Sequence, residues 1–139
     1  MYQHILLAAD GSNNAIRAAK EAAYIASLIP DAEVEILFVV DLSKVKDEVL
    51  HSQNHEEIEL KRKQKLIPVQ QELTEKNVKY RVTFINGDPG PTIVDYANKN
   101  SVDLLIIGSR GLNTLQEFVL GSVSHKVVKR AHCPVMIVK

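Results

Sequence analysis

Two clusters of glycine and serine near the carboxyl terminus have the composition of a loop that binds phosphate. Gly108-Ser109-Arg110-Gly111 is separated by nine residues from Gly121-Ser122-Val123-Ser124. Glycine lets another group approach the backbone closely, and a helix that opens with serines offers free N–H groups and hydroxyls to an anion. Arg110 could add a cationic contact to a phosphate. The spacing therefore predicts a phosphate cradle.

Asp10 is the candidate residue for a divalent cation beside those phosphates. It follows the apolar run His4–Ala9 and opens a cluster of turn-forming residues that ends at Asn14. Magnesium often uses one or two carboxylates together with the phosphates of a nucleotide, so Asp10 could hold Mg²⁺ there. Each feature also has a structural explanation, since glycines end strands, Ser122 can cap a helix, Asp10 can start a turn and Arg110 can be solvated. Only their combination favours a binding site.

The same residues give little support for efficient catalysis. The chain contains neither the Gly-x4-Gly-Lys-Ser/Thr pattern of Walker loops nor the Gly-x-Gly-x-x-Gly pattern of dinucleotide-binding folds. A nucleotide could be bound at the predicted cradle without a catalytic base, and so without being turned over. A slow magnesium-dependent ATPase or phosphotransferase is the alternative.

Two further groups of polar residues are better explained without a ligand. His51, His55 and Glu59 have the spacing of metal ligands on one helical face, but a fourth ligand is missing and a solvated polar face is favoured. The basic run Lys61–Lys65 follows several glutamates. That order favours charge pairs within the helix over contact with nucleic acid.

Composition limits the class of protein. The 139 residues are 45% hydrophobic and 24% charged, which suits a single domain over residues 1–139. Seventeen basic residues balance seventeen acidic ones, so we expect no nucleic-acid partner and no membrane partner. Cys133 is the only cysteine, which excludes an internal disulfide, and we expect both Cys133 and His125 to be structural. Without a signal peptide or a membrane-spanning stretch, a cytoplasmic location is expected.

Short apolar runs alternate with helical patterns along the chain. Strands are predicted at His4–Ala9, Val34–Val40, Tyr80–Ile85, Val102–Ile107 and Pro134–Val138. Helices are predicted at Ala15–Ile29, Glu56–Lys76, from Pro91 onward and at Ser122–Ala131. Pro68 predicts a kink or a break in the second of these helices. The segment Leu42–His55 is expected to be flexible.

The alternation of strand and helix predicts a doubly wound parallel sheet with helices on both faces. In such folds, ligands bind beyond the carboxyl ends of the strands, where the winding direction reverses. If the first and fourth strands flank that point, the loop that carries Asp10 meets the glycine loop after Ile107. The two halves of the predicted site would then lie together.

Three segments of the chain together resemble the universal stress protein family. They are an amino-terminal Ile-Leu-Leu-Ala-Ala-Asp-Gly-Ser, the pattern Gly-x2-Gly-x9-Gly-Ser after an apolar strand, and a carboxyl-terminal Cys-Pro-Val-Met-Ile-Val. The resemblance covers essentially the whole chain. It implies a Rossmann-like, five-stranded sheet of order 3-2-1-4-5, an ATP site and dimers.

The resemblance also implies roles for individual residues. Asp10 would face the ribose and the phosphates, and Ala9 and Val39 would border the adenine. The segment Ile107, Gly108, Ser109, Arg110 and Gly111 would line the ribose-triphosphate side, and Gly121, Ser122, Val123 and Ser124 would hold the phosphates. The residues do not choose among AMP, ADP and ATP.

The apolar last strand predicts a homodimer. Val135–Val138 would be an edge strand with unpaired backbone groups, and a second copy paired with it would cover them. The favoured function is a nucleotide-dependent regulatory protein of the stress response, whose binding of a protein partner changes with nucleotide occupancy. An interaction module with an architectural glycine loop and no nucleotide is the second alternative.

Overall fold

The computed structural model describes residues 1–41, 55–109 and 121–139. Its elements are β1 (His4–Ala8), α1 (Asn13–Ser27), β2 (Glu33–Val40), α3 (His55–Glu75), β3 (Lys79–Asn86), α4 (Pro89–Lys99), β4 (Leu104–Gly108), α5 (Ser122–Arg130) and β5 (Val135–Val138). Every predicted strand and helix has a counterpart among them. The flexibility expected of Leu42–His55 concerns residues outside the described ranges, apart from His55, which opens α3.

The strands form a parallel sheet in the order β3-β2-β1-β4-β5. This order confirms the predicted fold class. Ala8 at the end of β1 is paired with Leu37 of β2 on one side and with Ile107 of β4 on the other. The carboxyl ends of the central strand β1 and of its neighbour β4 therefore lie side by side, as the predicted site requires.

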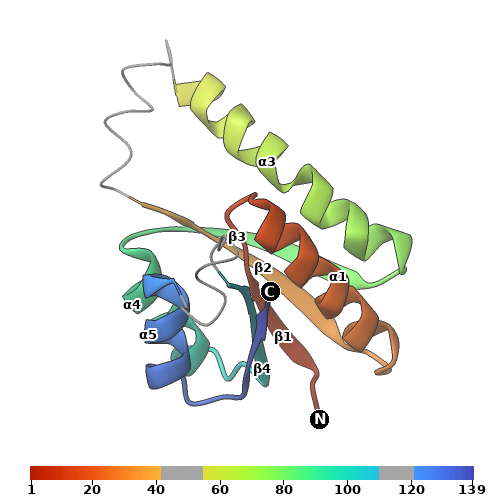
Figure 1. Ribbon diagram of the computed structural model, residues 1–139. Coiled ribbons are helices and arrows are strands. Elements are labelled where there is room, and N and C mark those ends of the chain that lie inside the picture. The colour runs from red at the N-terminus through yellow and green to blue at the C-terminus, as the bar shows by residue number, and fades with distance from the viewer. Residues whose placement is uncertain (42–54, 110–120) are drawn as a thin grey trace.

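Helices cover both faces of the sheet (Figure 1). On one face, the alanines of α1 lie close to the strands, and α1 also packs against α3. On the other face, α4 and α5 pack against each other and cover a second core that includes Leu37, Leu105 and Val127. Small residues on α1 allow a close approach between helix and sheet. Within the described ranges, no helix has the length and apolarity needed to cross a membrane.

The helix α3 differs from the prediction at Pro68. One helix runs through this proline from His55 to Glu75, so the prediction of a break at Pro68 is wrong. A proline removes one helical hydrogen bond, but Leu66, Val69 and Leu73 are completely buried on the face of α3 that packs inward. Burial of these side chains outweighs the lost bond.

Candidate functional site

The loop between β1 and α1 presents Asp10 at the carboxyl edge of the sheet. Asp10 is exposed, and its Oδ1 accepts a hydrogen bond from the backbone N–H of Ser12 at 2.9 Å. The hydroxyl of Ser12 in turn accepts a bond from the N–H of Ala15 at 3.2 Å and caps α1. Gly11 between them has a φ of +83°, which glycine adopts readily. Asp10 therefore does start a turn, and its Oδ2 accepts no hydrogen bond from the described residues.

The amino end of α5 is fastened to the end of β4. The buried hydroxyl of Ser124 donates to the carbonyl oxygen of Gly108 at 3.1 Å. The first N–H with an acceptor inside the helix is that of His125, which donates to the carbonyl of Gly121 at 2.9 Å. The N–H groups of Ser122, Val123 and Ser124 have no intrahelical acceptor and carry the positive end of the helix dipole. This arrangement suits an anion.

The glycines of the predicted cradle differ in what they do. A Cβ atom added at Gly108 would lie 2.8 Å from both the Cβ and the carbonyl oxygen of Asn14. Gly108 is therefore required by the packing of α1 on β4. Gly121 has a φ of −61° and a ψ of 159°, a conformation open to any residue. Arg110 and Gly111 lie outside the described residues.

The residues expected beside the adenine lie at the ends of β1 and β2. Ala9 is buried, and its N–H donates to the carbonyl of Leu37 at 3.0 Å. Val39 is half-buried and, like Ile107, packs on the face covered by α4 and α5, whereas Ala9 belongs to the opposite core. The structure thus places Ala9, Asp10, Val39 and Ile107 at one edge of the sheet.

Metal-ligating groups are sparse in the described ranges, where no group of three or more histidine, cysteine, aspartate or glutamate residues could hold an ion. A magnesium ion bound mainly by phosphates needs no such group, and the carboxylate of Asp10 would suffice as its protein ligand. His51, His55 and Glu59 were considered as metal ligands from their spacing in the sequence. His51 lies outside the described residues, and Glu59 is exposed.

Two smaller predictions are also addressed by the structure. Lys61 lies 3.6 Å from the carboxylate of Glu57, which confirms charge pairing within the helix for this lysine. Cys133 is half-buried, and burial raises the pKa of its thiol, which agrees with a structural cysteine.

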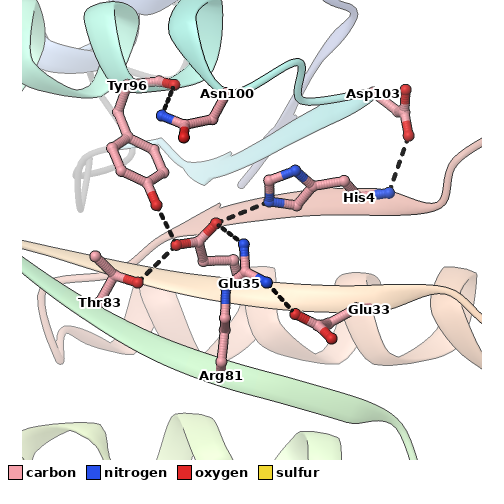
Figure 2. Close-up of polar contacts among 8 residues, drawn as sticks. All are labelled: His4, Glu33, Glu35, Arg81, Thr83, Tyr96, Asn100 and Asp103. Carbon is pink, nitrogen blue, oxygen red and sulfur yellow. Dashed lines mark hydrogen bonds and ion pairs between the residues drawn. The ribbon is translucent and has the colours of Figure 1, made fainter.

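A polar cluster around Glu35 was not predicted from the sequence. Glu35 in β2 is completely buried. Figure 2 shows its carboxylate among side chains from β1, β3 and α4. It accepts hydrogen bonds from His4 Nε2 at 2.8 Å, from Arg81 at 2.9 Å, from the Thr83 hydroxyl at 2.6 Å and from the Tyr96 hydroxyl. A charged residue within the apolar strand Glu33–Val40 was the only local signal of this cluster.

The cluster keeps Glu35 ionised. Burial acts to raise the pKa of Glu35, but the hydrogen bonds from Thr83, Tyr96, Arg81 and His4 outweigh it and lower this pKa from 4.5 to about 2. Burial, and then the bond to Glu35, raises the pKa of Tyr96. Glu35 lies on the same face of β2 as Val39 but closer to the amino end of the sheet, and all its bonds are within the fold. We therefore assign the cluster to the scaffold.

A comparison with protein families matches the universal stress protein family over residues 1–139. The chain belongs to the universal stress protein family. Universal stress protein MJ0531 of Methanocaldococcus jannaschii is 35% identical over 150 residues, which cover 100% of this chain and 83% of that protein.

Solved structures of other family members share the fold of this universal stress protein. The structure of MJ0577 from M. jannaschii superposes with a TM-score of 0.82 at 32% identity, covering 100% of this chain and 96% of that one. A family member from Arabidopsis thaliana, solved with AMP bound, has a TM-score of 0.67 at 24% identity and covers 99% of this chain and 91% of that one. At 24% identity, the similarity to the Arabidopsis protein shows a shared fold.

Proposed function

We propose that this universal stress protein binds an adenine nucleotide at the carboxyl edge of its sheet and acts as a nucleotide-dependent regulatory protein in the cytoplasm. The observation that carries the proposal is the pairing of Ala8 with Ile107. It brings the Asp10 loop, which follows β1, next to β4, to which the amino end of α5 is fastened by Ser124. A carboxylate and a set of free N–H groups then lie at the point where the sheet reverses its winding.

The described residues fit the parts of a nucleotide. The exposed Asp10 has an oxygen free for the ribose hydroxyls or for a magnesium ion beside the phosphates. Gly121, Ser122, Val123 and Ser124 offer N–H groups to the phosphates, and Ala9 and Val39 offer an apolar border to the base. Arg110 and Gly111 belong to the same proposal. A family member of this fold was solved with AMP, which supports an adenine nucleotide as the ligand.

The direct test is a calorimetric titration of nucleotide-stripped protein with ATP and Mg²⁺ at two temperatures. Binding near one nucleotide per chain is expected, and AMP and ADP titrated in the same way would rank the resident ligand. Absence of heat at both temperatures would contradict the proposal and favour the interaction module. Phosphate release measured on the saturated complex would separate a regulatory protein from a slow ATPase.

A homodimer through β5 is part of the proposal. The strand Val135–Val138 lies at the edge of the sheet, contains no charged residue and is half-buried throughout. The opposite edge strand β3 carries the exposed charges of Lys79 and Arg81, which discourage pairing with another chain. An uncharged edge strand at β5 and a charged one at β3 are what we expect if β5, and not β3, pairs with a second copy.

A further inference from the structure

The turn that carries Asp10 packs directly against helix α3. A Cβ atom added at Gly11 would lie 2.7 Å from Lys65 Cβ and 3.1 Å from the backbone carbonyl oxygen of Lys65. At these distances either the turn or α3 would have to move, because a change of side-chain rotamer displaces neither of the two atoms. The residue next to Asp10 is therefore in contact with α3, although the two segments lie far apart in the chain.

The position of Asp10 depends on this turn. The carboxylate Oδ1 of Asp10 accepts a hydrogen bond from the N–H of Ser12, and the hydroxyl of Ser12 accepts one from the N–H of Ala15 in the first turn of α1. Gly11 has a φ of +83°, a conformation that glycine adopts readily. The turn is thus held by α1 on one side and by α3 on the other, and a displacement of Gly11 would move Asp10 with it.

The contact with Gly11 lies at the boundary between two unequal halves of α3. On the carboxyl-terminal side of Lys65, the side chains of Leu66, Val69 and Leu73 are completely buried in the core that α3 shares with α1. Among the described side chains of residues 56–65, Ile58 alone is buried, and it belongs to neither core. This half of the helix extends beyond the beginning of α1 (Figure 1). The Lys65 turn therefore lies where the burial of α3 in the core ends.

Pro68 weakens α3 at the same place. A proline within a helix lacks the N–H that would bond to the carbonyl four residues earlier, here that of Gln64, and its ring crowds this carbonyl. Gln64 directly precedes Lys65. The two halves of α3 are consequently joined, at the contact with Gly11, by a turn that lacks one helical hydrogen bond.

We propose that α3 regulates the nucleotide site, because its Lys65 turn holds Gly11 and thereby positions Asp10 for the nucleotide. This inference rests on the proposed function and adds Lys65 to it as a positioning residue, which acts through its backbone and Cβ atom and not through its charge. Coupling between two binding events is reciprocal. A protein partner that displaces the first half of α3 would lower the affinity for the nucleotide, and a bound nucleotide would hold α3 in place.

The test puts a methyl group into the contact and then makes room for it. Gly11→Ala is expected to weaken ATP binding roughly tenfold, because the added Cβ atom pushes the turn away from α3. Adding Lys65→Gly to this variant removes the atom that the methyl group would meet at 2.7 Å, and ATP affinity should recover by roughly threefold or more. The positive φ at residue 11 strains both proteins equally, so the difference between them reports the contact.

The matched control combines Gly11→Ala with Lys63→Gly. Lys63 and Lys65 are both exposed in α3, and a glycine within a helix is unfavourable at either position. The control should therefore have a melting temperature similar to that of the first double variant, without any recovery of ATP affinity. All titrations are made well below the lowest of these melting temperatures.

A second measurement uses the unchanged protein alone. Hydrogen exchange followed by mass spectrometry, at short times that report local opening, would compare the protein with and without ATP. Exchange is expected to slow in the Lys65 turn of α3 as well as in the loop that carries Asp10. It should change much less in residues 70–75, which belong to the buried half of the helix.

Different outcomes would overturn different statements. ATP binding by Gly11→Ala as tight as that of the unchanged protein would overturn the role of Lys65 and leave the proposed function standing. The same affinity in the Lys65→Gly and Lys63→Gly double variants would show that the loss comes from the strained turn, with the same consequence. If Gly11→Ala does not fold, exchange that slows at Asp10 but not at Lys65 would overturn the role of Lys65. Failure of the unchanged protein to bind ATP would refute the proposed function itself.

Discussion

The carboxylate of Glu35 in β2 accepts a hydrogen bond from the hydroxyl of Thr83 in the neighbouring strand β3 at 2.6 Å. Tyr96 of α4 donates to the same oxygen, so this carboxylate ties an edge strand and a helix to the centre of the sheet. Buried carboxylates are costly unless every lone pair is used, and here the partners of Glu35 meet that condition. The cluster therefore stabilises the scaffold that carries the candidate site.

Glu35→Gln should destabilise the protein by about 2–4 kcal/mol, because it leaves Arg81 and the hydroxyl donors without a charged acceptor. Urea unfolding followed by circular dichroism would measure the change. The matched control is Glu33→Gln in the same strand, which removes ion pairs to the exposed side chains of Lys79 and Arg81 and should cost less than about 1 kcal/mol. Equal losses in the two variants would contradict a special role for Glu35.

The free energy of unfolding should decrease at acidic pH because the carboxylate of Glu35 becomes protonated. The pKa of Glu35 is lowered from 4.5 to about 2, so the folded state favours its ionised form. The resulting stabilisation, about 3 kcal/mol, is complete above pH 4.5 and is lost as the pH falls toward 2. Free energies of unfolding measured between these pH values should fall more steeply for the unchanged protein than for Glu35→Gln. Parallel curves would place the acid sensitivity elsewhere.

Most of the fold could be predicted from the sequence, because the patterns that indicate its strands and helices are local. Apolar runs such as His4–Ala9 and the alanine spacing of α1 predict elements directly, and their alternation predicts the parallel sheet. The course of α3 through Pro68 was less predictable, because it depends on burial of Leu66 and its neighbours against the rest of the fold. Tertiary packing there overrides the local preference of proline.

The candidate site was predictable in part, for the same reason. Asp10 and the amino end of α5 are marked by turn and helix-opening residues, and the structure places both at the carboxyl edge. The hydrogen-bond donors to Glu35 come from segments far apart in the chain, so no spacing of residues in the sequence predicts this cluster. The reason for Gly108 is likewise a contact with Asn14 across two elements.

The two described glycines of the predicted cradle should respond differently to alanine. Gly121→Ala suits the backbone, whose φ is −61°, so its melting temperature should stay near that of the unchanged protein. The added methyl group would crowd a nucleotide at the amino end of α5, and ATP affinity should fall at least roughly tenfold. Gly108→Ala meets Asn14 at 2.8 Å and should lower the melting temperature. Unaltered ATP binding by Gly121→Ala would argue against phosphate contact at this helix end.

The proposed dimer can be tested through the backbone of β5. Pro134 and Val138 direct their carbonyl groups to β4, where they accept from the N–H groups of Leu105 and Ser109 at 3.0 and 2.7 Å. Because the direction of hydrogen bonding alternates along a strand, Ile137, which lies one residue out of step, directs its N–H to the open edge. Proline at this position removes an outward donor and leaves the bonds to β4 in place.

Ile137→Pro should therefore convert a dimer of the unchanged protein into a monomer at micromolar concentration, as measured by light scattering after gel filtration. The control is Val128→Thr on α5, which changes an exposed apolar residue away from β5 and should leave the mass unchanged. Circular dichroism would show that both variants are folded. A monomeric mass for the unchanged protein, or a dimer that persists in folded Ile137→Pro, would show that β5 does not join two copies.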